Sequence, residues 1–451
     1  MTRFPALRST AAAAAFAATV LTVGPGWGAG LGLIRDAEIE NTIRAYASPL
    51  FDAAGLDPDA VNVYLIQDKA LNAFVAGGQN IFVTTGLLMR AENSLQVIGV
   101  IAHETGHIAG GHLARMADEL RGASNQALIA QILGVLIAVG TGQGGAAVAV
   151  GAGGIHLAER TLLQYSRVQE QAADQAALQY LDRTRQSARG MAEFFDILGD
   201  QELLSAARQD PYVLTHPLTR DRAEFVRNHV AKSPNSGVAA NPRFEEMFRR
   251  MRAKLVGFVE PVARTQQAYP DKDASLPARY ARAIALYRAA RLDAAVPLVD
   301  GLIAEEPKNP YFHELKGQML FETGKVKEAL APYVESVRLA PNEPLLRTSL
   351  AHVQIEINDP ALEREALRNL MAALQKDTAN PTAWRLAATA YGRNGDLGMS
   401  ALSLAEFNLL TGKPVDARGQ AIRAKRLLKE GSPGWLRAED IERATDRARS
   451  R

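Results

Sequence analysis

The chain has 451 residues, which predicts two or three domains at the usual size of roughly 100 to 200 residues and excludes a single small module. Hydrophobic residues make up 47% and charged residues 22%, a balance that excludes wholesale disorder and a coiled-coil rod. The net charge of +2 gives no basis for sequence-independent binding of nucleic acid. Cysteine is absent, so any bound metal must be held by histidines and carboxylates.

The first 30 residues have the layout of a secretory signal peptide. Arg3 and Arg8 precede an uncharged, alanine-rich stretch at residues 9–23, and small residues follow around Ala29. A retained anchor is the alternative, because cleavage after Ala29 would leave Trp27 where a small residue is favoured. We predict that the protein is exported and that residues 1–30 are its signal peptide.

A helix and a small sheet are predicted next. Apolar residues recur at helical spacing over residues 36–54. β-branched residues mark strands at residues 61–66 and 81–85, and the Gly77-Gly78 pair lies before the second strand. We therefore predict that these two strands form a hairpin.

Two further helical regions follow the predicted sheet. Apolar residues at helical spacing predict a helix over residues 95–120. Residues 122–158 contain no charged side chain and are interrupted by the sequence GTGQGG at residues 140–145. We expect two apolar helices that cover the cleft or lie on a membrane surface, rather than a membrane span.

The second half of the chain has a period of 34 residues. Pro307 and Pro341 stand one period apart, as do Leu286 and Leu320. This is the tetratricopeptide period, and it predicts four repeats, the third irregular, at residues 278–430. Such repeats stack into a curved α-solenoid whose concave side usually binds an extended peptide or a helix, although a purely supporting bundle is the alternative. Residues 261–277 are predicted to be a linker, and residues 431–451 a polar C-terminal tail.

The most informative motif is HETGH at residues 103–107. On a helix, His103 and His107 lie on one face and can share a metal ion, while Glu104 lies beside it. Zinc held in this way lowers the pKa of its water, and a neighbouring carboxylate can accept the water's proton during attack on a peptide bond. The motif therefore predicts a zinc peptidase domain, with one zinc ion, at residues 31–260.

Two residues are candidates for the third zinc ligand. His112 lies one residue too early for the longer HExxHxxGxxH signature, which has Leu113 at its last position here. Glu170 lies on a predicted helix, and Asp174, four residues later, shares its face. Glu170 could then bind zinc while Asp174 holds a ligand histidine. We favour Glu170, and His112 stays as the alternative.

The strand at residues 81–85 is a candidate for substrate binding. Peptidases of this kind hold an extended substrate by adding it to a strand, and Ile81, Phe82 and Val83 would pair with it. The alternative is a hairpin with no contact to substrate.

Four motifs occur in order along the chain: NAFVAGGQNIFVTTGLL at residues 72–88, HETGHIAGGH at residues 103–112, SRVQEQAAD at residues 166–174 and THPLTRDR at residues 215–222. Together they resemble the HtpX and CaaX-processing family of zinc metalloendopeptidases. The resemblance implies that zinc is bound by His103, His107 and Glu170, with Glu104 as general base.

The resemblance also assigns supporting residues. It implies that Asp174 and His112 stand behind the zinc ligands, and that His216 and Arg222 belong to a late His-Pro motif. His216 could donate a hydrogen bond to the oxyanion, or it could bind zinc as a fourth ligand and leave the enzyme latent.

These features predict a mainly α protein of the α+β class. A gluzincin-type metallopeptidase domain with a small β-sheet would be followed by an α-solenoid of tetratricopeptide repeats. The resemblance implies a periplasmic endopeptidase that degrades misfolded or stalled outer-membrane β-barrel proteins, with the repeats recruiting substrate or the barrel-insertion machinery. The alternative is a periplasmic chaperone or scaffold whose zinc site is latent.

Overall fold

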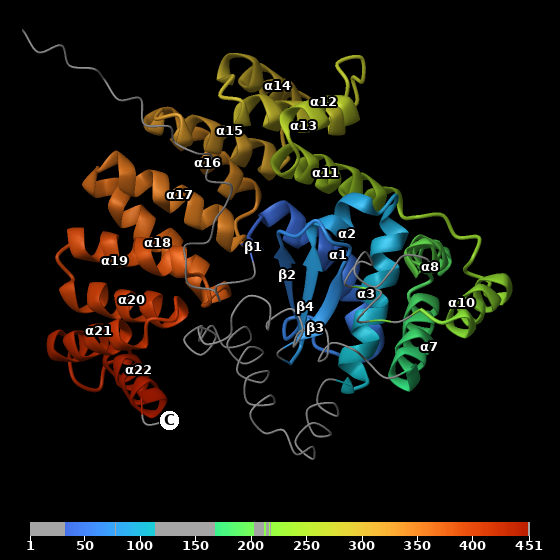
Figure 1. Ribbon diagram of the computed structural model, residues 1–451. Coiled ribbons are helices and arrows are strands. Elements are labelled where there is room, and N and C mark those ends of the chain that lie inside the picture. The colour runs from blue at the N-terminus through green and yellow to red at the C-terminus, as the bar shows by residue number, and fades with distance from the viewer. Residues whose placement is uncertain are drawn as a thin grey trace, which may run out of the picture.

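The computed structural model describes residues 32–76, 78–112, 167–202, 212, 216 and 218–449. The predicted signal peptide and the predicted apolar helices at residues 122–158 lie outside these residues. The described part confirms the mainly helical class: a domain with a small sheet precedes a curved row of paired helices (Figure 1). Among the described residues, no helix combines the length and apolar character that crossing a bilayer requires.

The sheet has four strands in the order β1-β2-β4-β3, counted over the described residues. Their bounds are β1 (Leu33–Ile34), β2 (Asn62–Ile66), β3 (Ala73–Ala76) and β4 (Asn80–Thr84). β2 and β4 are parallel, with Val63 opposite Ile81, so the predicted hairpin between them is wrong. The hairpin is formed by β3 and β4 instead, because the connection between β2 and β4 contains a third strand.

Seven helices surround this sheet in the described part of the first half: α1 (Ala37–Ala54), α2 (Thr85–Arg90), α3 (Ser94–Ala109), α7 (Arg167–Arg183), α8 (Arg189–Glu202), α10 (Arg220–Lys232) and α11 (Pro242–Val259). One hydrophobic core joins the sheet to these helices, and Tyr46, Phe51, Phe194 and Phe248 are among its largest buried side chains. Helix α3 lies at the centre and contacts α1, α7, α8 and β3.

Helix α3 is shorter than the predicted helix at residues 95–120. It ends at Ala109, and Gly111 has a φ of +61°, a left-handed conformation that glycine adopts without strain. The chain therefore leaves the helical path directly after the HETGH motif. His112, one residue after this turn, is directed back toward the helix and contacts His107.

The second half of the described chain consists of a short helix and five helical pairs. Helix α12 (Val262–Ala268) lies in the predicted linker. The pairs are α13 (Leu276–Arg288) with α14 (Leu292–Glu305), α15 (Pro310–Glu322) with α16 (Val326–Leu339), α17 (Pro344–Ile357) with α18 (Pro360–Lys376), α19 (Pro381–Arg393) with α20 (Leu397–Leu410), and α21 (Pro414–Leu427) with α22 (Pro433–Arg449).

Local sequence explains where several of these helices begin. Asn309, Asp359 and Asn380 each accept a backbone hydrogen bond as the N-cap of a helix whose first residue is proline. The structure differs from the prediction at the C-terminus. Residues 433–449 form α22, which packs on α21 and buries Ala438 and Ile441, so a fifth pair replaces the predicted polar tail.

Charged and polar side chains join the start of α1 to the repeats. Arg35 forms an ion pair with Asp377 at 2.9 Å, and Asn41 donates a hydrogen bond to Glu343 at 2.6 Å. Ala37 packs within the hydrophobic cluster of α15, α16 and α17. The peptidase-like half therefore rests against the concave side of the helical row (Figure 1).

A buried lysine lies at the centre of this junction. Lys254 of α11 is 3% exposed, and its Nζ lies 2.8 Å from Asp36 Oδ2, 3.4 Å from Glu38 Oε2 and 3.8 Å from Glu314 Oε2. Tyr280 donates a hydrogen bond to Glu38 at 2.8 Å. One cation thus connects three carboxylates that come from both halves.

Candidate metal centre

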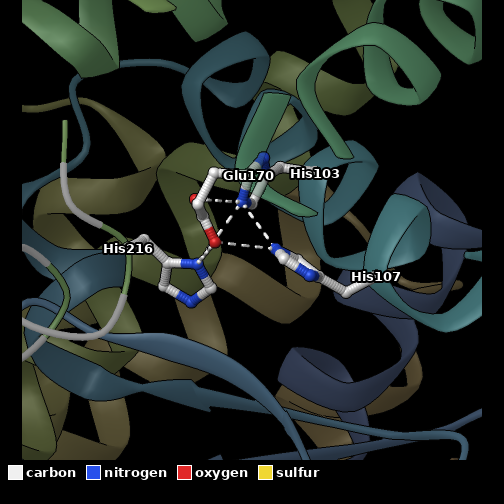
Figure 2. Close-up of side chains that lie close together, drawn as sticks. All are labelled: His103, His107, Glu170 and His216. Atoms are coloured by element: carbon white, nitrogen blue, oxygen red, sulfur yellow. Dashed lines mark hydrogen bonds and ion pairs between the residues drawn. The ribbon is translucent and has the colours of Figure 1, made fainter. Parts of the chain in front are cut away.

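Helix α3 brings two histidines of the HETGH motif together. Residues four apart lie on the same face of a helix, and the Nε2 atoms of His103 and His107 are 3.0 Å apart. Both side chains are 1% exposed. Their ring nitrogens therefore converge on one point inside the domain, as Figure 2 shows.

Glu170 reaches the same point from the first turn of α7. Its Oε1 atom lies 3.3 Å from His107 Nε2, and its Oε2 atom lies 3.4 Å from His103 Nε2. The close packing of α7 on α3 depends on Gly106, because a Cβ atom there would lie 2.7 Å from the carbonyl oxygen of Ala173. The glycine inside HETGH thus positions the carboxylate of α7.

His216 completes a cluster of four side chains. Its Nδ1 atom lies 3.0 Å from Glu170 Oε1 and 3.4 Å from His103 Nε2 (Figure 2). One ligand atom from each of His103, His107, Glu170 and His216 lies within 4.8 Å of the other three, and all four residues are buried.

The geometry of the four residues fits a zinc ion. Tetrahedral zinc with bond lengths of about 2.0–2.1 Å places neighbouring ligand atoms roughly 3.3 Å apart, and the distances given above lie close to this value. Imidazole nitrogens with one carboxylate are also a ligand set that suits zinc. The cluster can therefore hold the metal that the sequence predicts.

Glu104 lies beside the cluster. It is fully buried, and neither carboxylate oxygen has a hydrogen-bond partner among the residues that the structure describes. Its Oε1 atom lies 3.6 Å from His216 Nε2. Because burial of an unbonded carboxylate is unfavourable, this group is suited to accept a hydrogen bond from a ligand or from water.

Three further residues hold the ligand side chains. Asp174 Oδ1 lies 2.9 Å from His103 Nδ1, which orients the opposite ring nitrogen toward the cluster. Arg222 donates from Nε to Asp174 Oδ2 at 2.6 Å and pairs with Glu170 Oε2 at 2.8 Å. His112 Nδ1 lies 2.9 Å from His107 Nδ1. The structure thus places all the residues of the predicted metal site together.

Burial and neighbouring charges shift the pKa values of this site. Burial raises the pKa of Glu104 to about 7, which suits proton exchange near neutral pH. Burial lowers the pKa of His107. Burial also opposes protonation of His103, but its hydrogen bonds to Asp174 and Glu170 raise its pKa to about 10. Burial opposes ionisation of Glu170. The nearby His216 and the hydrogen bonds from His103 and His107 outweigh this effect and lower the pKa of Glu170.

Tyr212 is a site residue that sequence reasoning missed. Its ring centroid lies 4.6 Å from that of His216, and its carbonyl accepts a hydrogen bond from the His216 backbone at 2.7 Å. Its own N–H donates to Leu71 O at 3.4 Å. The four-residue spacing between Tyr212 and His216 was the only sequence signal for this contact.

The predicted substrate strand is wrong. β4 lies between β2 and β3, so both of its edges are already paired, and Ile81, Phe82 and Val83 are at most 1% exposed. An added strand needs an unpaired edge. In the described sheet the edge next to α3 is β3, at Ala73–Ala76.

Comparison with known proteins agrees with this geometry. Residues 34–230 match the sequence model of peptidase family M48, and residues 280–344 match a model of the tetratricopeptide repeat. A beta-barrel assembly-enhancing protease of Yersinia pestis is 25% identical over 407 residues, which cover 89% of this chain and 82% of the relative. A protein of the same name from Escherichia coli K12 is 26% identical over 412 residues, covering 89% and 81%.

A further relative, shorter than these two, is also called a metalloprotease. Metalloprotease LoiP of Escherichia coli K12 is 27% identical over 208 residues, which cover 44% of this chain and 72% of the relative. These matches confirm the metallopeptidase resemblance and the C-terminal repeats expected from the sequence motifs.

Proposed function

We propose that this chain, which carries a metallopeptidase domain of family M48 followed by tetratricopeptide repeats, is a zinc-dependent endopeptidase that cleaves misfolded or stalled exported proteins. The observation that carries the proposal is the buried cluster of His103, His107, Glu170 and His216 with the Glu104 carboxylate beside it. A metal site accounts both for the four converging ligand atoms and for a buried carboxylate with no hydrogen bond to any described residue.

His103, His107 and Glu170 would hold the zinc ion, which when bound polarises the scissile carbonyl and acidifies water. Glu104 accepts a proton from the attacking water at a carboxylate oxygen and returns it to the leaving amine. Asp174 and Arg222 keep His103 and Glu170 oriented, and His112 supports His107.

His216 is proposed to control access to the site. Its Nδ1 atom lies as close to Glu170 and His103 as a fourth zinc ligand would, and four protein ligands would complete a closed tetrahedron. In this arrangement the enzyme rests in a latent form. When substrate enters and His216 moves away from the ion, its ring can donate a hydrogen bond to the oxyanion.

An extended substrate would pair with the edge of β3. This strand contacts α3, which carries Glu104, and its outer edge is unpaired by any strand in the described sheet. Backbone pairing holds a substrate with little regard to its side chains, as degradation of misfolded proteins requires.

The site of action is proposed to be the periplasm. The signal peptide predicted at residues 1–30 supports export, and the relatives of similar length are called beta-barrel assembly-enhancing proteases. We infer that the substrates include stalled outer-membrane β-barrel proteins. The repeats would recruit these substrates or the barrel-insertion machinery.

The position of His216 favours a second candidate. If the closed ligand set persists, the chain acts as a periplasmic chaperone or scaffold through its repeats, and the zinc site is silent. The two candidates differ in whether Glu104 is needed for substrate turnover in the cell.

Zinc content and casein hydrolysis test the peptidase proposal. The purified mature chain should contain one zinc ion, Glu170→Ala should lose most of it, and Glu104→Gln should keep zinc but lose casein hydrolysis by roughly 100-fold or more. Glu328→Gln, which changes a largely exposed carboxylate in the repeats, is the control for purification and folding. Full zinc content in Glu170→Ala would indicate that His112 or His216 is the third ligand. Undiminished function of Glu104→Gln in cells would support the scaffold candidate.

A further inference from the structure

A cavity of about 540 Å³ lies between the β1 edge of the sheet and the concave face of the repeats. Its wall comes from β1 and the start of α1 on one side and from α15, α17 and α19 on the other. In Figure 1, β1 is the strand nearest to these helices. The volume is within the range of ligand sites, roughly 300–1,000 Å³. We call this cavity the junction groove; none of its wall residues belongs to the metal centre.

The sheet offers backbone hydrogen-bonding groups to the junction groove. β1 pairs antiparallel with β2, with Leu33 opposite Ile66 and Ile34 opposite Leu65. The N–H of Gln67 bonds to the carbonyl of Gly32, and hydrogen-bonded pairs alternate along an antiparallel ladder. The N–H and carbonyl of Leu33 therefore point away from β2, and Leu33 lines the groove. No other strand in the described residues pairs with this edge.

Most charged side chains around the groove are already neutralised. Arg35 pairs with Glu40 and Asp377, and Lys254 pairs with the carboxylates of α1 and α15. Glu322 keeps its negative charge and accepts a hydrogen bond from Tyr287. The ion pairs of Arg35 and Lys254 leave neither cation free for a ligand.

Arg385 of α19 is the exception. Its side chain is exposed, it lines the groove, and it has no hydrogen bond or ion pair within the described part of the chain. Burial and the charge of Arg385 lower the pKa of His352, so this neighbouring ring is neutral near pH 7. Among the described residues of the groove wall, Arg385 is therefore the one arginine or lysine without an ion pair.

Apolar rings lie beside this charge. Phe321 of α15 and His352 of α17 meet edge to face with ring centroids 4.8 Å apart, and Tyr333 completes the wall. The groove thus combines an unpaired strand edge, an aromatic surface and one arginine. Each of these features matches a different part of an extended peptide.

We propose that the junction groove binds an extended acidic segment of a protein substrate. The segment adds to the β1 edge by hydrogen bonds to Leu33, places an apolar side chain against Phe321, and directs an Asp or Glu side chain to Arg385. This inference rests on the proposed role of the repeats in recruiting substrate. The sheet then holds one part of the substrate polypeptide at β3 for cleavage and another part at β1 for capture.

Fluorescence anisotropy with a defined probe tests the proposal. The probe is a labelled, end-capped peptide of alternating valine and threonine with one central glutamate, and its partner has glutamine instead. The full mature chain carries Glu104→Gln so that the peptide stays intact. The glutamate peptide should bind roughly fivefold more tightly than the glutamine peptide at low salt, and Arg385→Ala should abolish this difference. Arg364→Ala, an exposed arginine of α18 outside the groove, should preserve it.

Backbone pairing has a separate test. Two versions of the probe are methylated at alternate amide nitrogens, one in each register. One version should lose binding, because methylation removes the donor that faces β1, and the other should bind like the unmodified probe.

Equal binding of the glutamate and glutamine peptides would overturn the proposal, and so would tolerance of methylation in both registers. The proposal would also fail if the chain without peptide formed a dimer and Arg385→Ala abolished that dimer, because the groove would then bind a second copy of the chain. Casein hydrolysis by the chain with intact Glu104 is measured in parallel. Casein hydrolysis without peptide binding would contradict only the proposed role of the junction groove. Peptide binding without hydrolysis would contradict only the proposed peptidase function.

Discussion

Asp174 links a proposed metal ligand to an arginine of the metal centre. One oxygen lies 2.9 Å from His103 Nδ1 and the other accepts a hydrogen bond from Arg222. Arg222 in turn pairs with Glu170. A single carboxylate therefore orients one proposed ligand directly and a second through an arginine.

Asp174→Asn should weaken zinc binding by roughly 10- to 100-fold, because the amide cannot hold both His103 and the charge of Arg222. Competition with a zinc chelator measures the affinity. Asp182→Asn on the same helix, where Asp182 bonds to Ser233 and Asn235, is the matched control and should leave zinc affinity unchanged. Equal zinc affinity in Asp174→Asn and the unmodified chain would contradict the orienting role.

At the scale of residues, spacing in the sequence identified the motif but not all its neighbours. HETGH fixes His103, Glu104 and His107 through helical periodicity alone. Spacing alone left two candidates, Glu170 and His112, for the third zinc ligand. His216 and Arg222 were assigned to the site only through the resemblance to a known family. Tyr212 was missed because its four-residue spacing from His216 does not by itself distinguish it among the 11 tyrosines.

At the scale of elements, the contact between α3 and α7 brings the carboxylate of Glu170 to the two histidines. Gly106 permits it, since any larger residue would press on the backbone of Ala173. The backbone of α7 cannot yield without moving Glu170 and Asp174 as well. Gly111, the third glycine of HETGHIAGGH, turns the chain just after α3 and returns His112 to His107.

Gly106→Ala should destabilise the chain by about 1–3 kcal/mol, because the added methyl group meets backbone rather than a flexible side chain. Gly419→Ala is the matched control: it is also in a helix interior, has open space around it, and should stabilise by about 0.5–1 kcal/mol. Thermal unfolding and zinc content measure both effects. A stable Gly106→Ala variant with full zinc would show that α7 can shift freely.

The elements also show why the strands were harder to predict than the helices. The helical repeats follow from a 34-residue period and from Asn-Pro or Asp-Pro starts, both local signals. The pairing of β2 with β4 depends on a third strand, Ala73–Ala76, whose four buried residues show no polar alternation. Because this third strand was not predicted, β4 was expected to have an unpaired edge.

At the scale of the whole molecule, the two halves are held by a junction that no local pattern indicates. Asp36 and Glu38 are distant in the sequence from Lys254 and Glu314. The four side chains meet only when the repeats curve around the start of α1. A buried cation such as Lys254 needs carboxylate partners to offset the loss of its hydration. The junction also forms one wall of the groove proposed to capture substrate.

Glu314 makes the stability of this junction depend on pH. Burial, together with Asp36 and Glu38, outweighs Lys254 and raises its pKa from 4.5 to about 8. Glu343 also faces it from the start of α17. A carboxyl whose pKa is raised on folding gives its full stabilisation below the unfolded value and loses it as the pH rises through the folded value. The junction should therefore weaken between pH 4.5 and about 8.

Glu314→Gln should reduce this dependence, and the raised pKa values of Glu38 and Glu343 should account for the rest. The variant should match the unmodified chain at pH 4.5 and become more stable than it as the pH approaches about 8, by about 1–3 kcal/mol. Thermal unfolding across this range measures the difference. Glu328→Gln, which removes a largely exposed carboxylate of α16, should give a difference that does not grow with pH. If Glu314→Gln is instead less stable at every pH, the ionised carboxylate stabilises the junction through Lys254 and the sign of the linkage is reversed.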